Sequence, residues 1–223
     1  MSEDSSEKSP IDLLVEYSVQ DSFQTFRDQM AAAMLLPSKR AIRKYCLERA
    51  VDRLGFAGLV AEFGVWKGSG VNLFARQLQG TNATVWGFDS FEGLEEDWTG
   101  HARGGQAGRF TLKGVSPEVE PSVRLVKGRV QDTVPKWLAE NADQPVVFAH
   151  LDLDTYSPTR FVLDALRPQL VAGSVLLFDE LYGYPGWRNH EYKALQECLP
   201  EQTYRYIAFS QQAVGIEITA ALD

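Results

Sequence analysis

Five short runs of β-branched and apolar residues alternate with helical stretches, and this alternation constrains the fold more than any other feature. The runs are LVAEFGV (59–65), ATVWGFD (83–89), VRLVKG (123–128), VVFAHLDLD (146–154) and SVLLFDE (174–180). Strand-helix-strand succession is typical of a parallel sheet, and Ser157 is the predicted N-cap of the helix between the last two runs. Two almost contiguous runs, 203–210 and 212–219, predict an antiparallel hairpin. The sequence thus predicts a doubly wound α/β sheet of seven strands, with helices on both faces and the last strand pair antiparallel.

The chain before the first strand predicts a helical extension and not a second domain. Residues 1–10 have the composition of a disordered tail, and residues 11–55 are predicted to be helical. Ser38 is the predicted N-cap of a helix that Gly55 ends. Residues 56–223 are expected to form one globular unit together with the extension, because a chain of 223 residues suits a single core.

The composition excludes several classes of partner and site. Acidic residues outnumber basic ones by 30 to 22, so the formal charge of −8 disfavours nucleic acid and anionic membranes as partners. The one basic cluster contains Lys39, Arg40, Arg43 and Lys44. Cys46 and Cys198 have no CxxC spacing, so neither a disulfide framework nor a zinc site is predicted. The polar N-terminus differs from a secretory signal, and no apolar run approaches about 18 residues, so we expect a cytoplasmic protein.

The first strand ends in a glycine-containing turn, EFGVWKGSG (62–70). Gly64, Gly68 and Gly70 would let the backbone approach a ligand, and the N-terminus of the following helix favours a carboxylate. The turn is not the GxGxxG of dinucleotide enzymes, because the bulky Trp66 and Lys67 stand where a pyrophosphate needs close approach. The alternative interpretation is a tight turn without a ligand.

The second and third strands end in further candidate ligands. Asp89 lies at the distance where nucleotide-binding folds place an acid that accepts from ribose hydroxyls, and Ser90 follows it. After the third strand, Asp132 could accept from an adenine amino group, with Gln131 beside it. The alternative for both aspartates is local capping of a turn or helix.

Acidic side chains gather at the ends of the fourth and fifth strands. His150, Asp152 and Asp154 alternate, which on an extended strand places all three on one face. Asp179 and Glu180 end the strand expected beside it. Several carboxylates around one small volume suit a hard cation such as Mg²⁺. The alternative is that Asp152 contacts only cofactor or substrate while the other acids cap helices.

Four motifs, in this order and spacing, resemble the macrocin O-methyltransferase family of class I S-adenosylmethionine-dependent methyltransferases: EFGVWKGSG, GFDSFEGL, HLDLDTYSPT and LLFDELYGYPGWR. The likeness covers about residues 40–210 and implies the strand order 3-2-1-4-5-7-6. It implies S-adenosylmethionine with its methionine over Gly64–Gly70, its ribose on Asp89 and its adenine near Gln131 and Asp132. The resulting cofactor-binding set is Glu62, Gly64, Trp66, Gly68, Gly70, Asp89, Ser90, Gln131, Asp132 and Asp152.

The resemblance also implies a divalent metal, Mg²⁺, held by Asp152, Asp179 and Glu180, and a homodimer. Two departures from the family pattern bear on these implications. Trp66 stands where the general methyltransferase motif often has glycine, and FDE stands where the antibiotic-sugar enzymes commonly have DD.

The acceptor region has two candidate segments. Tyr182, Tyr184, Trp187 and Arg188 are predicted to wall the acceptor site, and the alternative is an aromatic loop that packs on its own helix. Residues 95–120 are rich in glycine and long for a connection, which favours a mobile lid over an ordered surface loop. The N-terminal helices either cover the site or form a dimer contact.

The predicted function is S-adenosylmethionine-dependent O-methylation of a sugar hydroxyl or other diol in a small molecule. A cation on the acid cluster would lower the pKa of the acceptor hydroxyl, and a base would remove its proton. Asp154 and His150 are the candidate bases, with an acid of the cluster favoured. The competing hypotheses are a non-catalytic S-adenosylmethionine-binding module and, less favoured, a nucleotide-dependent oxidoreductase.

Overall fold

In the computed structural model, which describes residues 8–220, eight strands form one mixed sheet. The strands are β1 (Met34–Leu35), β2 (Leu59–Phe63), β3 (Val85–Asp89), β4 (Val123–Lys127), β5 (Val146–Leu151), β6 (Leu170–Phe178), β7 (Tyr204–Ser210) and β8 (Ala213–Ile218). Their order is β1-β7-β8-β6-β5-β2-β3-β4. Strands β2 to β6 pair in parallel, and β8 is antiparallel to both β6 and β7. The predicted order of the seven strands is therefore confirmed, with β1 added at the edge.

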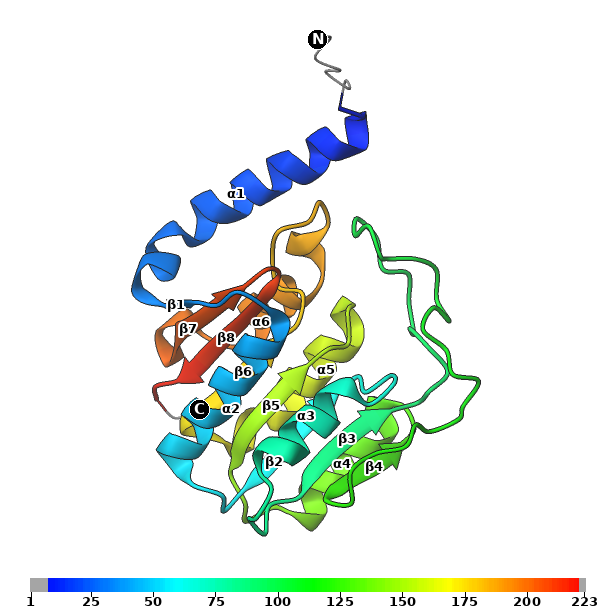
Figure 1. The fold of residues 1–223 in the computed structure, drawn as a ribbon, viewed down its shortest axis with the longest axis vertical. Helices are drawn as coiled ribbons and strands as arrows, with labels where there is room; N and C mark the ends of the chain where they lie inside the picture. The colour runs from blue at the N-terminus through cyan, green and yellow to red at the C-terminus, as the bar shows by residue number, and fades with distance from the viewer. Residues whose placement is uncertain (1–7, 221–223) are drawn as a thin grey trace, which may run out of the picture.

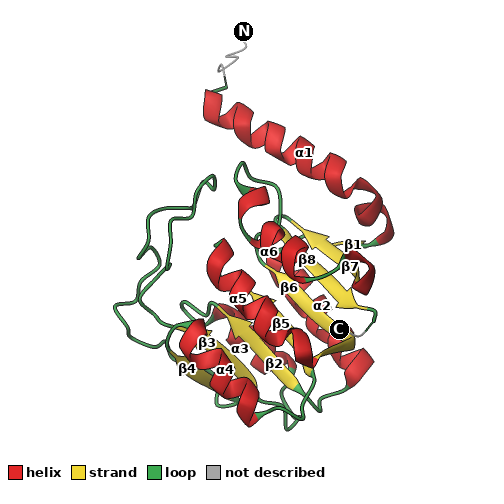
Figure 2. Ribbon diagram, turned by 180° about the vertical axis from the view of Figure 1, so that it is seen from behind, coloured by secondary structure: helices red, strands yellow, loops and turns green. Residues whose placement is uncertain are grey.

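Helices cover both faces of this sheet (Figure 1 and Figure 2). On one face α2 (Lys39–Leu54) packs across β5, β6 and β8, and α3 (Ser69–Gln77) packs on β2 to β4. On the other face lie α4 (Val130–Glu140), α5 (Tyr156–Leu166) and α6 (Glu191–Cys198). Each face has its own buried cluster of apolar side chains. The doubly wound α/β class is confirmed.

Two local predictions differ from the structure. The predicted helical stretch 11–55 is interrupted by β1, which pairs in parallel with β7, so that Met34 lies opposite Ala208. Two exposed residues have no detectable strand pattern, so only the neighbouring strand decides this pairing. The helix after β5 begins at Tyr156 and not after Ser157, because Glu96 of a distant loop accepts from the Ser157 N–H at 2.9 Å and hydroxyl at 2.8 Å.

The predicted helix caps around α2 are confirmed. The Ser38 hydroxyl accepts from the Ala41 N–H at 3.2 Å, and Gly55 ends the helix with φ +70°. Helix α1 (Pro10–Ala32) begins at a capping box formed by Ser9 and Asp12. Pro10, the last residue of the predicted tail, therefore belongs to α1, and residues 1–7 of that tail lie outside the described part of the chain.

Helix α1 projects from the body (Figure 1), and Phe26 is the one buried aromatic side chain on it. Phe26 is 1% exposed and its ring centroid lies within 6 Å of five rings, those of Tyr182, Trp187, Tyr192, Tyr206 and Phe209. Nearer the N-terminus, large apolar side chains such as Ile11, Leu14 and Tyr17 are exposed. Across residues 8–220, none of the helices is both long and apolar enough to span a bilayer.

Phe26→Ala is expected to lower the free energy of unfolding by about 3–5 kcal/mol, because it leaves a cavity among five rings. Phe23→Ala is the matched control on the same helix, since Phe23 is 55% exposed and its replacement should change stability by less than about 1 kcal/mol. Urea denaturation of both variants measures the difference. Equal losses in the two variants would show that Phe26 is not the anchor of α1.

Candidate functional site

One cavity of about 260 Å³ opens where β2, β3, β5 and β6 reach their carboxyl ends. One part is bordered by the turn after β2 and by the end of β3, through Gly64, Trp66, Ser69, Asp89 and Ser90. The other part is bordered by the acid cluster, Asp152, Asp154, Asp179 and Glu180. In an open parallel sheet this is the edge where ligands bind. The structure therefore joins the predicted cofactor turn and the predicted acids in one space.

The turn after β2 needs glycine because two strand ends meet there. Gly64 has φ +91°, and a Cβ atom on it would lie 1.7 Å from the Asp152 carbonyl oxygen. The Asp152 N–H also donates to the Phe63 carbonyl at 2.8 Å, which holds the two strand ends together. Gly68 is left-handed at φ +81° and is the N-cap of α3. Gly64 is therefore required for the close approach of the two strand ends, and it also lines the cavity.

Glu62 lies beneath this turn and does not line the cavity. Its side chain is 1% exposed, and its Oε2 accepts from the Val71 N–H at 2.6 Å. A Cβ atom on Gly70 would lie 1.7 Å from the Glu62 Oε1, so only glycine leaves room for the carboxylate. The structure thus places two predicted cofactor ligands, Glu62 and Gly70, in the support of the α3 N-terminus.

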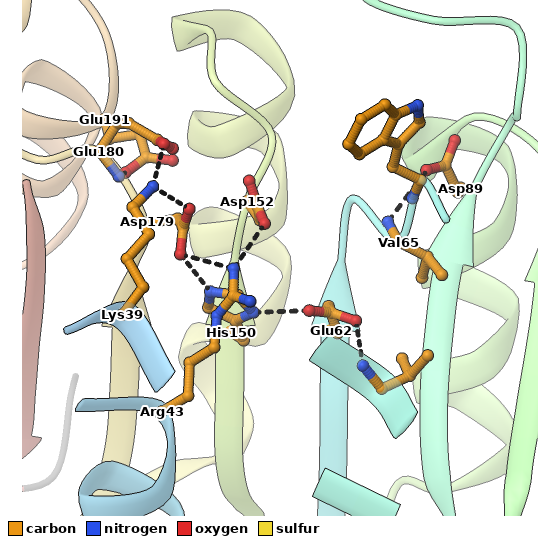
Figure 3. A network of polar contacts seen from close by, with 12 residues as sticks. Lys39, Arg43, Glu62, Val65, Asp89, His150, Asp152, Asp179, Glu180 and Glu191 are labelled. Carbon is orange, nitrogen blue, oxygen red and sulfur yellow. Dashed lines mark hydrogen bonds and ion pairs between the residues drawn. The ribbon is translucent and has the colours of Figure 1, made fainter. Parts of the chain in front are cut away.

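Asp89 holds the other side of the turn and faces the cavity (Figure 3). Its Oδ2 accepts from the N–H groups of Val65 at 2.9 Å and Trp66 at 2.7 Å, and its Oδ1 accepts from the Phe91 N–H at 2.7 Å. A carboxylate has about four acceptor sites, so one remains for a ligand. Trp66, at φ +47°, packs edge-on against Phe110 at 5.6 Å.

Two residues predicted near the adenine do not line the cavity. Helix α4 begins at Val130, and Asp132 in its first turn is exposed to solvent. The Gln131 amide donates to Glu95 Oε2 at 2.8 Å. The backbone just before them lies at the cavity wall through Gly128 and Arg129. Val130, the first residue of α4, also lines the cavity, so Gln131 reaches the wall only through its bond to Glu95.

His150 lies inside the protein and not in the cavity. Strand β5 ends at Leu151, so the predicted strand alternation does not extend to Asp152 and Asp154. The His150 ring is 0% exposed and joins two carboxylates, Glu62 through Nδ1 at 2.8 Å and Asp179 through Nε2 at 3.1 Å. Burial opposes its charged form, but the hydrogen bonds to Asp179 and Glu62 prevail and raise the pKa of His150. His150 therefore orients Asp179 from behind.

Two cations from α2 reach the acid cluster (Figure 3). The Lys39 ammonium contacts the carboxylates of Asp179 and Glu180. The Arg43 guanidinium lies 2.9 Å from Asp179 Oδ1 and 3.3 Å from Asp152 Oδ2. Both belong to the basic cluster seen in the sequence, but the sequence does not indicate that they face acids more than a hundred residues away.

The cluster carries more acid than these cations neutralise. Burial, then the neighbouring charges of Asp179 and Glu180, raises the pKa of Asp152 well above its usual range. Burial and the same kind of repulsion raise the pKa of Asp154 likewise, and raise that of Glu180 to about 7. Burial opposes ionisation of Asp179 too, but the His150 hydrogen bond, Arg43 and Lys39 outweigh it and lower its pKa. Asp179 is therefore the acid of the cluster that ionises most readily.

The residues present fit a divalent cation. Asp152, Asp154 and Glu180 each offer an oxygen, and these atoms lie within 4.8 Å of one another. The Glu180 Oε2 is buried and has no hydrogen-bond partner among the described residues. Carboxylate oxygens are the ligands that Mg²⁺ prefers. Of the predicted metal set, Asp152 and Glu180 are thus brought together with Asp154, while both oxygens of Asp179 are engaged by Lys39, Arg43 and His150.

The predicted acceptor wall lies elsewhere. Tyr184 and Trp187 are each 2% exposed, and neither Tyr182 nor Arg188 lines the cavity. The Trp187 indole N–H donates to Asp21 at 3.2 Å, and Arg188 binds the same carboxylate at 2.9 Å. Tyr182 and Trp187 pack on Phe26 of α1, whereas Tyr184 packs edge-on against Trp98 and His101 of the loop 95–120. The four predicted residues are therefore engaged by distant segments that the sequence pattern of their own loop does not reveal.

The loop 95–120, for which the sequence favours a lid, supplies walls of the cavity. Trp98 lines the cavity, is 3% exposed, and stacks on His101 at 4.1 Å. Hydrogen bonds fasten the loop to distant segments, from His101 to Gln212 at 3.1 Å and from His190 to the Thr99 carbonyl at 2.9 Å. Other residues missed by the sequence analysis are Lys39, Arg43, Leu94, Glu95, Arg103, Phe110 and Arg129.

Solved structures share this fold over nearly the whole chain. The calicheamicin methyltransferase CalS11 is 24% identical, with a TM-score of 0.66 over 95% of this chain and 94% of that chain. The O-methyltransferase NovP is 19% identical, with a TM-score of 0.57 over 94% of this chain and 98% of that chain. The SAH-bound methyltransferase PaMTH1 of Podospora anserina is 12% identical, with a TM-score of 0.51 over 92% and 88%.

A comparison of the sequence with models of protein families assigns the chain to one family. No curated protein matches it. The model of a family described as "Methyltransferase domain" matches residues 61–181, which run from β2 through the end of β6 and include both the glycine turn and the acid cluster. The match covers more than half of the 223 residues. This chain belongs to that methyltransferase domain family.

Proposed function

We propose that this chain transfers a methyl group from S-adenosylmethionine to a hydroxyl oxygen of a sugar or other diol-containing small molecule. The observation that carries the proposal is the single cavity that joins the Asp89 end of β3 to the acid cluster. Among the similar structures, one CalS11 structure is described as a TDP-rhamnose 3′-O-methyltransferase. The resemblance of the four sequence motifs to the macrocin O-methyltransferase family supports the same chemistry.

We propose that Asp89 and Ser90 bind the ribose of the cofactor and that the turn from Gly64 to Gly68 faces its methionine. The remaining acceptor site of the Asp89 carboxylate suits a ribose hydroxyl. The cofactor, when bound, supplies an electrophilic methyl group on a sulfonium. The chain's own contribution is to hold the acceptor oxygen in line with that methyl group.

Asp154 is the proposed base for the acceptor hydroxyl. It lines the cavity, its side chain lies among the acids, and its raised pKa makes it a stronger base than an ordinary carboxylate. A divalent cation held by Asp152 and Glu180, with Asp179 as the third carboxylate in place of its contact with Lys39, would supply Lewis-acid polarisation of the acceptor hydroxyls. His150 is a positioning residue, since it contacts Asp179 and not the cavity.

Binding of S-adenosylhomocysteine tests the cofactor site. Calorimetric titration is expected to give micromolar binding to the wild type and roughly tenfold or weaker binding to Asp89→Ala, because the ribose loses its proposed acceptor and the turn loses its hydrogen bonds to the carboxylate. Asp132→Ala is the matched control, since Asp132 is exposed and does not line the cavity, and its affinity should equal that of the wild type.

The outcomes separate the competing functions. Absence of binding to the folded wild type, with or without Mg²⁺, would contradict the proposed function. Binding without turnover on any sugar or diol acceptor, TDP-rhamnose included, would favour the non-catalytic binding module. Equal weakening in Asp89→Ala and Asp132→Ala would mean that Asp132 also contributes to binding of the cofactor.

A further inference from the structure

Lys39 contacts both Asp179 and Glu180 of the acid cluster. It is the first residue of α2, whose Ser38 cap fixes the direction in which the helix starts. Its side chain is 19% exposed, lines the cavity and ends between the carboxylates of Asp179 and Glu180 (Figure 3). Arg43, one turn later, approaches the cluster from the side of Asp152.

Glu180 contacts the Lys39 ammonium and also belongs to the three carboxylates that could hold a metal ion, Asp152, Asp154 and Glu180. Its Oε1 contacts Lys39, whereas its Oε2 is buried without a partner among the described residues. An oxygen of Glu180 also lies within 4.8 Å of oxygens from Asp152 and Asp154. A divalent ion on these oxygens would stand close to a unit positive charge, and repulsion at such short range is large even when solvent moderates it.

We propose that Lys39 is the internal counter-cation of the acid cluster and that a divalent cation binds by displacing its ammonium from Asp179 and Glu180. This inference rests on the metal site of the proposed function but not on the methyl transfer itself. Lys39 suits an exchange because its ammonium is a point charge on a flexible stem that can withdraw into the cavity. Arg43 stays, since it bridges Asp152 and Asp179. Once Lys39 withdraws, Asp179 can join Asp152 and Glu180, the set that the family resemblance implies.

Displacement of the Lys39 ammonium by a divalent cation predicts two measurable properties of a variant that lacks this ammonium. Lys39→Met keeps the length of the side chain and removes its charge, so Mn²⁺ should bind at least about tenfold more tightly than to the wild type. Without metal, the variant should have a lower Tm than the wild type, because Asp179 and Glu180 lose their partner. Saturating Mn²⁺ should restore that Tm. Lys39→Arg, which keeps the charge, should retain weak Mn²⁺ binding.

The experiment is a calorimetric titration with Mn²⁺ alone, together with thermal unfolding with and without Mn²⁺. Lys44→Met is the matched control, because it removes the same charge from the exposed side of the same helix and should match the wild type in both readouts. Equal Mn²⁺ affinity in Lys39→Met and the wild type would overturn the proposal. So would a Lys39→Met variant that binds no Mn²⁺, or one that stays unfolded at saturating Mn²⁺. Binding of S-adenosylhomocysteine, measured separately, tests the proposed function and does not depend on this exchange.

Discussion

Asp154→Asn is expected to lower kcat by about three orders of magnitude on any acceptor that the wild type methylates, since removal of a general base costs about 10²–10⁴ in rate. Asparagine keeps the shape of the side chain but cannot take up the proton of the hydroxyl. Affinity for S-adenosylhomocysteine should change by less than about twofold, because Asp154 lies in the acid part of the cavity and not beside Asp89.

The Tm of Asp154→Asn and the pH dependence of kcat distinguish a catalytic base from a residue that only stabilises the fold. Burial, Glu180 and the other acids raise the pKa of Asp154, so its charged form is disfavoured in the folded protein and a neutral residue should leave the Tm unchanged or raise it. A base acts when deprotonated, so wild-type kcat should rise with pH as Asp154 ionises, and the variant should lose this rise. Asp164→Asn, at an exposed position of α5, is the control. An active Asp154→Asn variant would exclude Asp154 as the base.

Gly64→Ala is expected to remove most of the stability of the protein, with a loss of more than about 4 kcal/mol. The new Cβ atom would lie 1.7 Å from the Asp152 carbonyl oxygen, so β2 and β5 would have to separate where the cofactor turn meets the acid cluster. The positive φ of +91° adds the cost of a left-handed conformation, roughly 1–2 kcal/mol. S-adenosylhomocysteine binding should be lost with the turn geometry.

Gly80→Ala separates the two causes. Gly80 has nearly the same φ, +88°, but a Cβ atom on it would meet nothing within 4 Å. It should therefore lose only about 1–2 kcal/mol and keep its affinity for S-adenosylhomocysteine. Urea denaturation and calorimetry measure both variants. Similar losses in Gly64→Ala and Gly80→Ala would mean that the strand ends tolerate separation, and that the backbone conformation alone requires glycine.

The acid cluster shows how the fold concentrates charge that would otherwise be unfavourable. Parallel strands β5 and β6 end side by side, so that Asp152 and Asp179 must lie close together whatever their charges. Buried acids in such proximity are costly unless they are paired, protonated or bound to a cation. Lys39, Arg43 and His150 supply part of that compensation. The remaining excess of acid is what makes the place suitable for a cation and for proton transfer.

The sequence by itself determined the elements that depend on local pattern. Periodicity of apolar residues indicated the seven long strands, and the helical stretches between the first five of them indicated that these five are parallel. Their order across the sheet came from the resemblance of the four motifs to a known family. Because parallel strands end at one edge, the sequence also brought Gly64, Asp89, Asp152 and Glu180 to the same cavity. These inferences need only the direction of each strand and the residue at its end.

Only the tertiary structure decided which side chains from other parts of the chain reach the carboxyl edge of the sheet. Lys39 reaches Glu180 across 141 positions of sequence, and Trp98 reaches the cavity through a loop without periodicity. Tyr184 and Trp187 were predicted to meet the acceptor, yet they are buried with Phe26. No local pattern specifies such contacts, because their free energy comes from groups that are adjacent only after the chain has packed. The strand ends thus follow from the sequence, and the partners around them follow from packing.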